Sequence, residues 1–431
     1  MRPVLWLFPL AFLLVVGTAT YSSADPDDLD VIVIFKKGTD AGRRDDIIRQ
    51  SGSHPRYHLR TTAASSARLG DRALRIILER NPEVEAVIPD RIMHAHAQTT
   101  PAGVQRIGAA PGTIPGVTGV GVGVAVVDTG SDLNHADLKP FGSTCFTAFV
   151  SCQDDNGHGT HVTGIIAARN NGSVVVGVAP GATVYPVKVL NAQGSGSDST
   201  VMAGLDWVAK NGPTLSPPVR VVNMSLGRPG TLADNPALRA VIQSLYNAGI
   251  TVVVSAGNDP TMQVSQQVPA TYPEVFAVAS TTALTGTNGG CRSFRTTIAA
   301  DTASYFTTDG ALSAQTIGVT ISAPGEDQEN VARNCFINSV GILSTRLGGG
   351  TTRLSGTSMA APHVTGVVAL MWQKAQQLVP PQSLAPEDAR AKIRANASDA
   401  AAPLNSPTST YTFDGEREGV IFAPGAVGAV K

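Results

Sequence analysis

The stretch VGVAVVDTG, residues 122–130, decides the fold, because a run of apolar and β-branched residues ends abruptly at Asp128. Nearly continuous apolar runs of this length are typical of strands buried on both faces of a parallel sheet. Later runs have the same character, namely Thr183–Val189, Arg220–Asn223, Thr251–Ser255 and Val275–Ala279. Patterns with a helical period lie between and after them, at His161–Arg169, Asp198–Lys210, Pro236–Ala248 and Ser358–Gln377. Strands that alternate with helices predict an α/β fold, an open and mostly parallel sheet with helices on both faces.

The composition of the whole chain narrows the class of protein. Its 431 residues are enough for two or three domains and a sizeable core. With 42% hydrophobic and 15% charged residues, 44 glycines and 28 prolines, the chain is globular and loop-rich rather than disordered or coiled-coil. The 32 basic and 33 acidic residues give a net charge of -1, so we expect neither nucleic acid nor an anionic membrane as a partner.

Residues 1–24 have the features of a secretory signal peptide. Arg2 precedes an apolar core from Val4 to Val16, and Ser22 and Ala24 supply the small side chains that a signal peptidase requires. This core is shorter than the roughly 20 residues that span a membrane, although an uncleaved anchor is the alternative. We therefore expect a secreted protein with no membrane segment once residues 1–24 are removed.

Residues 25–97 form a second segment with a different surface. They include 12 basic and 12 acidic residues, about 33% charged, whereas residues 98–431 are about 12% charged. The pattern predicts a strand, a helix, an extended stretch, a helix and a strand, at Val31–Phe35, Ala41–Gln50, Tyr57–Thr62, Asp71–Arg80 and Val84–Pro89. This order suits a small α+β, ferredoxin-like domain with two helices on an antiparallel sheet. The aperiodic stretch that follows, His94–Pro101, is typical of a linker open to cleavage.

Four polar residues lie where the predicted strands end or the predicted helices begin. Asp128 and Asn258 each follow a strand, His158 lies just before the next helix, and Ser358 opens the last long helix. Because the carboxyl ends of parallel strands share one edge of a sheet, we expect these side chains to converge. A serine nucleophile needs a base, a carboxylate that orients the base, and donors for an oxyanion. This set of residues supplies each of them.

Three blocks that contain these residues resemble the signature blocks of the subtilisin-type serine proteases. They read VVDTG at 126–130, NGHGTHVTG at 156–164 and GTSMAAPH at 356–363, and they occur in that family's order, Asp, His and then Ser. Further similar stretches are GVAP at 177–180, NMSLG at 223–227 and SAGN at 255–258, so the resemblance covers nearly all of residues 100–400. The stretch VLNAQGSGS at 189–197 is most similar to the proteinase K branch. The resemblance implies a peptidase domain over residues 98–431.

The resemblance also implies a role for each catalytic residue. Ser358 would attack the scissile carbonyl, His158 would take its proton and pass it on, and Asp128 would orient the imidazole. The side-chain amide of Asn258 and the backbone N–H of Ser358 would bind the oxyanion. No cofactor would be required for this chemistry.

The family likeness further implies how substrate and precursor are handled. A peptide would lie extended between Gln193-Gly194-Ser195 and Ser225-Leu226-Gly227, next to Ala256 and Gly257, bound mainly through its backbone and hence with broad specificity. Residues 25–97 are similar in element order and position to the family's propeptide. That implies an intramolecular inhibitor and folding aid, removed by self-cleavage near His96–Thr99 from a monomeric enzyme.

Other interpretations of these motifs explain less. An α/β-hydrolase esterase needs a histidine well downstream of Ser358, and only His363, on the same helix, follows. No Glu separates His158 from His161 as in zinc peptidases, so we expect His161, like His363, to be structural. The stretch GVGVG at 119–123 precedes its strand, which disfavours a dinucleotide site. An inactive protease fold that acts as a binding protein stays open as an alternative.

One departure from the family pattern concerns the rim of the primary specificity pocket. Arg228 follows Ser-Leu-Gly where a glycine is common, and Asp259 follows Asn258 on the opposite wall. One hypothesis is that Arg228 and Asp259 pair across the rim and limit large side chains. The alternative is that Arg228 points into solvent.

The four cysteines allow three disulfide connectivities. Relative to the family, the chain has insertions at Ala283–Thr302 and Glu326–Val340, which each carry one cysteine. We favour pairing Cys291 with Cys335 and Cys145 with Cys152, because the insertions interrupt neighbouring loops and export favours oxidation. Free thiols are the alternative.

Calcium is the usual structural ion of the family, but its presence here is open. Thr320 stands where the proteinase K branch has an acidic ligand. Other carboxylates available to a site are Asp137, Asp154, Asp155, Glu326 and Asp327, without EF-hand spacing. Residues 405–431 match the family poorly, and they form a closing strand and a tail or are trimmed.

Overall fold

The computed structural model describes residues 30–71, 73–90, 98–138, 141–293, 296–310, 318–398 and 418–431. They belong to two compact units, Met1–Ala95 and His96–Lys431, and each is treated by itself. The expected signal segment, residues 1–24, lies outside the described residues. Within the described ranges, no helix combines the length and the apolar character needed to cross a membrane.

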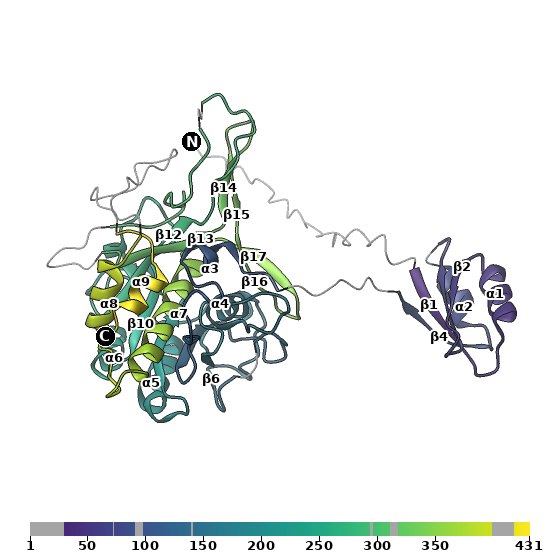
Figure 1. Cartoon of the computed structure of the whole chain (residues 1–431), viewed down its shortest axis with the longest axis horizontal. Helices are drawn as coiled ribbons and strands as arrows, with labels where there is room; N and C mark the ends of the chain where they lie inside the picture. The colour runs from purple at the N-terminus through teal and green to yellow at the C-terminus, as the bar shows by residue number, and fades with distance from the viewer. Residues whose placement is uncertain are drawn as a thin grey trace, which may run out of the picture. The chain divides into compact units, whose positions relative to one another are not determined.

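The first unit is an antiparallel sheet packed with two helices (Figure 1). Its elements are β1 (Asp30–Phe35), α1 (Ala41–Gln50), β2 (His54–His58), β3 (Ala64–Arg68), α2 (Leu74–Glu79) and β4 (Val84–Pro89). The sheet order β2-β3-β1-β4 and this element order are those of a ferredoxin-like domain. Side chains along β1 alternate between partly buried and buried. The buried ones, Val31, Val33 and Phe35, pack with Ile47 and Ile48 of α1 and Leu78 of α2.

One prediction for this unit is wrong. The extended stretch expected at Tyr57–Thr62 is the end of β2 and a turn, and a separate strand, β3, follows at Ala64–Arg68. The sequence of β3, ASSAR, has no β-branched or aromatic residue, so the usual strand pattern is missing. The strand forms because it pairs with β1 on one side and β2 on the other.

The second unit is built on a seven-stranded sheet of order β13-β12-β10-β8-β5-β7-β6, in which every pair is parallel. The strands are β5 (Gly123–Asp128), β6 (Phe146–Thr147), β7 (Thr183–Lys188), β8 (Val219–Met224), β10 (Thr251–Ser255), β12 (Val275–Thr282) and β13 (Ile321–Glu326). The α/β prediction is therefore confirmed. Neither β6 nor β13 was predicted, because β6 has two residues and β13, ISAPGE, contains proline and glycine.

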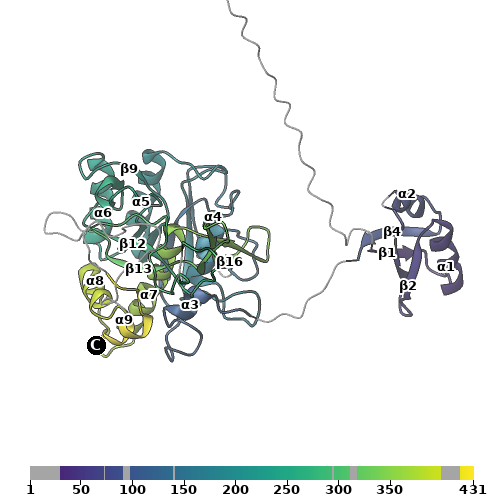
Figure 2. The ribbon, with the colours of Figure 1, turned by 90° about the horizontal axis from the view of Figure 1, so that it is seen from above.

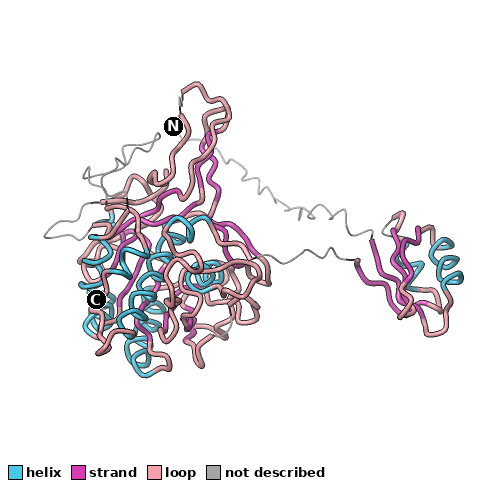
Figure 3. The backbone as a smooth tube through the Cα atoms, in the orientation of Figure 1, coloured by secondary structure: helices cyan, strands magenta, loops and turns pink. Residues whose placement is uncertain are grey.

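Helices cover both faces of this sheet, as Figures 2 and 3 show. The helices are α3 (Ala102–Arg106), α4 (His158–Ala167), α5 (Asp198–Asn211), α6 (Pro236–Asn247), α7 (Thr357–Gln376), α8 (Pro386–Ala395) and α9 (Ala423–Gly428), with 3-10 turns η2 (Gly212–Thr214) and η3 (Val264–Gln266). Along β10, Val253 joins the core under α4 and α7, whereas Val252 and Val254 join the core under α5 and α6. Alternate side chains thus fill two separate cores, as expected for a sheet buried on both faces.

Three short antiparallel pairs surround the sheet: β9 (Arg228–Pro229) with β11 (Gln267–Val268), β14 (Gln328–Val331) with β15 (Ile337–Val340), and β16 (Ile342–Thr345) with β17 (Thr351–Leu354). Disulfides join Cys145 to Cys152 and Cys291 to Cys335, and no cysteine is free, so the favoured pairing is confirmed. The second disulfide ties the β14–β15 hairpin to the loop after β12. The hairpin projects from the sheet in Figure 1.

The described end of the segment that matches the family poorly, residues 418–431, packs into the second unit. Val420 bridges Ser322 of β13, and the backbone N–H of Ala423 donates to the carbonyl oxygen of Ile107 at 2.8 Å. Val427 and Val430 lie in the same core cluster as α7. Residues 405–417 lie outside the described part of the chain.

Candidate active site

The polar residues singled out by their positions lie at the carboxyl edge of the second unit's sheet. Asp128 is the last residue of β5, His158 opens α4, and Ser358 lies in the first turn of α7. Asn258 follows β10 by three positions. Open parallel sheets form their sites at this edge, because the loops there connect to helices on both faces.

The imidazole of His158 is held by the carboxylate of Asp128. Its Nδ1 lies 2.8 Å from one carboxylate oxygen of Asp128 and 3.0 Å from the other. Asp128 is fully buried and also accepts a hydrogen bond from the backbone N–H of Thr129. Burial of His158 disfavours its charged form, but the adjacent Asp128 carboxylate outweighs that cost, so the pKa of His158 is raised. The pair therefore stabilises a proton on the imidazole.

Hydrogen bonds to Asp154 fix the turn after β5 against the start of α4. The Asp154 carboxylate accepts from the hydroxyl of Thr129 at 2.9 Å and from the backbone N–H groups of Asn156, Gly157 and Thr160 at 2.9 Å each. The approach is close enough to require glycine at position 159, since a Cβ there would lie 2.1 Å from the carbonyl oxygen of Gly130. The NGHGTHVTG block thus places His158 beside Asp128.

Ser358 is joined to the strand end of β8. Its hydroxyl donates to the carbonyl oxygen of Ser225 at 3.3 Å, and the Ser225 hydroxyl donates to the carbonyl oxygen of Ser358 at 2.8 Å. Among the described residues, no hydrogen bond joins His158 to Ser358. Catalytic hydrogen bonds are often long or misaligned without substrate and tighten when it binds, so this arrangement is compatible with a serine nucleophile.

The side-chain amide of Asn258 is oriented by Thr357. The Oδ1 atom of Asn258 accepts from the backbone N–H of Thr357 at 2.8 Å and from its hydroxyl at 2.9 Å. The Nδ2 group is left without an acceptor among the described residues, on a side chain that is exposed in the cleft. Position 356 lies beside it, because a Cβ on Gly356 would be 3.4 Å from Nδ2. A donor that is fixed but unused lies next to the start of α7, where backbone N–H groups also favour negative charge.

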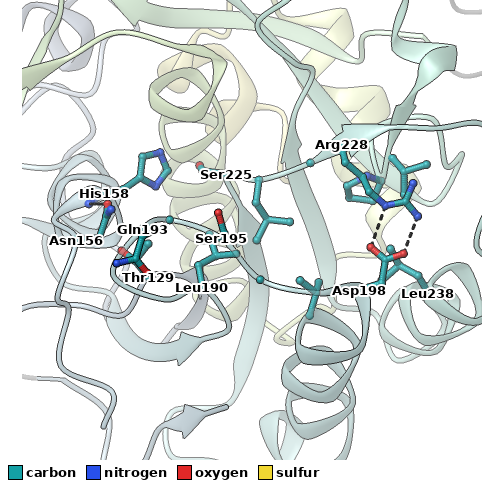
Figure 4. A pocket seen from close by; sticks show the side chains of 17 residues that line it. Thr129, Asn156, His158, Leu190, Gln193, Ser195, Asp198, Ser225, Arg228 and Leu238 are labelled. Carbon is teal, nitrogen blue, oxygen red and sulfur yellow. Dashed lines mark hydrogen bonds and ion pairs between the residues drawn. The ribbon is translucent and has the colours of Figure 1, made fainter. Parts of the chain in front are cut away.

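Two hollows adjoin these residues. The smaller has a volume of about 270 Å³ and is lined by Leu226, Gly227, Arg228, Pro229, Ser255, Gly257, Asn258, Gln267, Val268, Ala270, Thr357 and Ser358. The larger has a volume of about 510 Å³, and His158 and the predicted binding residues Gln193, Gly194, Ser195, Ser225, Leu226 and Gly227 line it (Figure 4). Ala256, which we also expected at the substrate, is fully buried in the core beneath and lines neither hollow.

The hypothesis that Arg228 pairs with Asp259 across the rim is wrong. The guanidinium of Arg228 instead binds Asp198, with Nη2 and Nε at 2.6 and 3.0 Å from the carboxylate, and Asp234, with Nη1 at 2.5 Å. The carboxylate of Asp259 turns back to accept from the backbone N–H and the hydroxyl of Thr261 at 2.8 and 2.6 Å. Asp259 thus has a partner two positions along the chain. Forming that local contact costs less conformational entropy than forming a pair across the cleft.

The other two histidines near the site are structural, as expected. The Nε2 atom of His161 contacts the carbonyl oxygen of Ile342 at 3.0 Å, and the Nδ1 atom of His363 contacts that of Met359 at 2.8 Å. Both rings are fully buried, and burial lowers the pKa of each to about 4. Neutral, enclosed rings of this kind fill the core.

Most of the carboxylates considered for calcium have other partners. Asp154 is used as described above, Asp155 binds Lys188, Asp327 binds Arg353, and Glu326 lies against Glu329 and accepts from Ser339. The described residues contain no cluster of three or more His, Cys, Asp or Glu side chains that would hold a metal ion. The hydroxyl of Thr320, which stands where the proteinase K branch has an acidic ligand, is buried without a hydrogen-bond partner.

Asp137 is different, because it is buried and its carboxylate accepts from Asn171 and Val175 of a loop that also supplies several carbonyl oxygens. The Gln98 side-chain nitrogen lies 2.5, 3.2 and 3.0 Å from the carbonyl oxygens of Arg169, Ser173 and Val175, three acceptors for two hydrogens. Asn171 on the same loop donates to Asp137 at 2.9 Å. Burial raises the pKa of Asp137, with its hydrogen bonds opposing the shift. Carbonyl, carboxylate and amide oxygens are the ligands Ca²⁺ prefers, so the residues present fit the ion.

A parallel α/β sheet that carries a serine at a helix start, with an imidazole held by a buried carboxylate nearby, is typical of serine hydrolases. Residues 119–413 match the Subtilase family of peptidases. The chain is 32% identical over 384 residues to Subtilisin E of Bacillus subtilis (strain 168), covering 86% of this chain and 89% of that protein. It is 38% identical over 298 residues to M-protease of Shouchella clausii (strain KSM-K16), covering 69% and 66% of the two chains.

The chain therefore belongs to the subtilase family, and it is a serine endopeptidase. Subtilisin Savinase of Lederbergia lenta gives a similar match, 38% identity over 279 residues, 64% of this chain and 86% of that one. The match to Subtilisin E is longer than the second unit alone, so it extends into residues of the first unit.

Proposed function

We propose that this chain hydrolyses peptide bonds with a triad of Asp128, His158 and Ser358. The observation that carries the proposal is the contact of His158 Nδ1 with both carboxylate oxygens of the buried Asp128. That contact keeps Nε2 free to accept the proton of Ser358 as it attacks the scissile carbonyl. His158 then returns the proton to the leaving amine, and an acyl-enzyme remains on Ser358 until water hydrolyses it.

The developing oxyanion would be bound by two donors. They are the Asn258 amide, held by Thr357, and the backbone N–H of Ser358, and both lie near Gly356, where a Cβ would be 3.4 Å from Nδ2 of Asn258 and 3.6 Å from the nitrogen of Ser358. Removing one such donor typically costs about 10²–10³ in turnover, because the charge forms where water is excluded.

The substrate would lie extended in the larger hollow, between the segments Gln193–Ser195 and Ser225–Gly227. Backbone groups of both segments would pair with the peptide backbone, which supports broad specificity. Two hydrogen bonds join Ser225 and Ser358, each from the hydroxyl of one to the carbonyl oxygen of the other. They would keep the segment Ser225–Gly227 in a fixed position relative to the nucleophile. The stretch at 189–197 is the basis for assigning the chain to the proteinase K branch.

The precursor is proposed to be secreted and to mature by its own activity. Residues 1–24 would direct export and be removed, and residues 25–97 would assist folding and inhibit the enzyme until they are cut off near His96–Thr99. The ferredoxin-like unit and the match that extends into it support this proposal. The mature enzyme, residues 98–431, would be a monomer without affinity for nucleic acid or membranes.

No cofactor is required for the reaction, but a structural calcium ion is proposed beside Asp137. The carboxylate of Asp137, the carbonyl oxygens of Arg169, Ser173 and Val175, and the amides of Gln98 and Asn171 would hold it. The ion would stabilise the loop that follows α4, and it would take no part in bond cleavage.

Covalent labelling tests the triad. We expect an organophosphate to label the purified protein at Ser358, and Ser358→Ala to lose both labelling and hydrolysis of a peptide substrate. Ser355→Ala, three residues earlier and just outside α7, removes an exposed hydroxyl and is the control that keeps both. Ser358→Ala produced in a protease-deficient host should also keep residues 25–97 attached. A wild-type protein that is folded, unlabelled and inactive after removal of residues 25–97 would contradict the proposal and favour a binding protein.

A further inference from the structure

The two insertions, residues 283–302 and 326–340, pack together into one arm of the second unit. The disulfide between Cys291 and Cys335 joins the loop after β12 to the β14–β15 hairpin. Between them lies a small buried core of their own, formed by Cys291, Ile298 and Val331. The arm, whose hairpin projects from the sheet in Figure 1, is therefore one fixed structure rather than two separate loops.

The charged groups of the arm are divided between its inside and its outside. All three of its carboxyl groups outside the stretch that pairs with Arg106 are buried, namely Glu326, Asp327 and Glu329. Arg292 and Arg333 are exposed, and neither has an ion-pair or hydrogen-bond partner among the described residues. A third arginine, Arg295, lies outside the described residues. The described outer surface of the arm is thus positively charged, although residues 98–431 contain 19 basic and 21 acidic residues.

The disulfide brings the two exposed arginines to the same end of the arm. Arg292 directly follows Cys291. Arg333 precedes Cys335 by two positions, and Phe336 follows it. The Cα atoms of the two cysteines are 5.1 Å apart, and the Phe336 side chain is 70% exposed. This tip therefore presents guanidinium groups and an aromatic ring, which are enriched where proteins bind other proteins.

The root of the arm contacts the turn that carries the proposed nucleophile. The Oγ atom of Ser339 lies 2.6 Å from that of Ser355, three residues before Ser358. From this contact the paired strands β14 and β15 extend about 10 Å toward the tip, at about 3.4 Å per residue. Neither hollow beside the catalytic residues is lined by a described residue of the arm. The tip is thus outside the proposed peptide site but only about five extended residues away from it.

We propose that the tip of the arm is a secondary binding site for acidic segments of protein substrates. The proposal rests on the proposed peptidase function, and it deepens that function by naming a substrate class, proteins with a run of Asp or Glu several positions from the scissile bond. Carboxylates of such a segment would pair with Arg292 and Arg333, and its apolar groups would pack on Phe336.

The position of the root favours a polypeptide over an acidic polysaccharide as the occupant. Because Ser339 contacts the turn before Ser358, a segment bound at the tip raises the effective concentration of its own scissile bond at the nucleophile. A short peptide that fills only the hollows does not reach the tip. Its hydrolysis is therefore independent of the two arginines.

Three substrates with the same cleaved sequence test the site. One is a short peptide, and two are unstructured proteins in which acidic runs or serine-glycine runs flank that sequence about five residues away on both sides. We expect KM for the acidic protein to be about threefold to tenfold lower than for the neutral protein, with similar kcat. Arg292→Gln combined with Arg333→Gln should remove this difference and leave kcat and KM for the short peptide unchanged. High salt should also remove it, because exposed charges are screened.

Lys210→Gln combined with Lys392→Gln is the matched control, because it removes the same charge from α5 and α8 and should keep the preference. Arg292→Glu combined with Arg333→Glu should reverse the preference, in favour of a protein with lysine runs. Equal KM values for the acidic and neutral proteins in the wild type, or an equal loss in the control, would overturn the proposal. Retention on an acidic polysaccharide that depends on both arginines, without a preference for the acidic protein, would assign the tip to polysaccharides instead. Failure of the wild type to cleave the short peptide would contradict the proposed function itself.

Discussion

The side-chain ammonium of Lys188 lies 2.6 Å from the carbonyl oxygen of Thr129, the residue that follows Asp128. The same ammonium donates to the carbonyl oxygen of Leu190 at 2.9 Å and binds Asp155 at 2.7 Å. The Lys188 side chain is 2% exposed, at the carboxyl end of β7. One buried cation thus ties together the turn after Asp128, the loop before His158 and the segment proposed to bind substrate.

Lys188→Met should therefore destabilise the enzyme and impair catalysis. The substitution leaves two buried carbonyl oxygens without a donor, and we expect a loss of about 2–3 kcal/mol in the free energy of unfolding, measured with urea. We also expect a lower kcat/KM for the hydrolysis of peptide substrates. Asp155→Asn keeps both carbonyl contacts and removes only a half-exposed partner, so it should cost less than about 1 kcal/mol. A larger loss in Asp155→Asn than in Lys188→Met would contradict this account of the cation.

The pH dependence of activity should follow the proton on His158. Burial opposes the imidazolium and Asp128 favours it, with a net raised pKa, so the neutral base becomes available only above the ordinary range of a histidine. We expect kcat/KM to rise with pH through that raised pKa. The same shift makes a contribution to folding stability that is complete below the unfolded-state pKa and is lost as the pH rises through the folded one.

Asp128→Asn tests the origin of that shift. The variant should move the acid limb of the kcat/KM profile to lower pH and reduce kcat by about 10⁴, because the amide neither stabilises the imidazolium nor selects the tautomer. Asp155→Asn serves as the control, since it removes a carboxylate that does not touch the imidazole. An acid limb that stays in place in Asp128→Asn would assign it to another group.

A second pH effect should come from Glu326 and Glu329, which are both fully buried. Each has one carboxylate oxygen without a hydrogen-bond donor, and the two groups lie against each other, as expected for two carboxyls that share a proton. Burial, followed by the neighbouring Glu326 charge, raises the pKa of Glu329 to about 9. The folded protein therefore retains a proton that the unfolded chain releases above its ordinary pKa of 4.5.

Stability should consequently fall between about pH 4.5 and 9, by at most about 1.4 kcal/mol per pH unit. Glu329→Gln keeps an amide donor for Glu326 and removes the shared proton, so its unfolding midpoint should vary less over this range and exceed the wild-type midpoint at pH 9. Thermal unfolding at several pH values measures this. Parallel profiles for the two proteins would show that the pair does not share a proton.

Calcium removal should lower thermal stability through Asp137. At a free ion concentration of about 100 times Kd, bound Ca²⁺ adds about 2.7 kcal/mol, so we expect a chelator to lower the Tm of the wild-type enzyme. Asp137→Asn should have a low Tm that no longer responds to the chelator. Asp154 is unsuitable as a control because it anchors α4, whereas Asp155→Asn should respond like the wild type. A Tm that is the same with and without chelator in the wild type would exclude the ion.

Much of the fold was predictable because its strands are nearly continuous β-branched runs. Thr251–Ser255 is β10 with the same bounds, and Ala41–Gln50 is α1, whose start is marked by the capping Asp40. The strand β13 was not predictable in this way, since Pro324 and Gly325 interrupt it. It forms because it pairs with the eight-residue strand β12, a relationship between distant segments.

The candidate site was predictable to a similar degree. Strand ends and helix starts gave the positions of Asp128, His158 and Ser358, because the topology of a parallel sheet brings such positions to one edge. The partner of Arg228 was not predictable, since Asp198 and Asp259 lie at nearly equal distances from it along the chain. The difference is that Asp259 already binds Thr261 within its own turn, which leaves Asp198 as the partner of Arg228. Only the three-dimensional arrangement of the loops shows which of the two carboxylates Arg228 binds.

The core of the second unit contains both Val104 and Val430, which come from nearly opposite ends of its sequence. The N–H of Ala423 also binds the carbonyl oxygen of Ile107, so α9 and α3 are joined directly. During synthesis, Val104 is made long before Val430. Until the end of the chain has been made, the core lacks the apolar side chains of its last residues, such as Val427 and Val430. The unit can therefore complete its folding only after synthesis has passed residue 430, which would suit the export proposed for this chain. Extensions fused after the exposed Lys431 should be tolerated, whereas a chain shortened before Ala423 should remain incompletely folded.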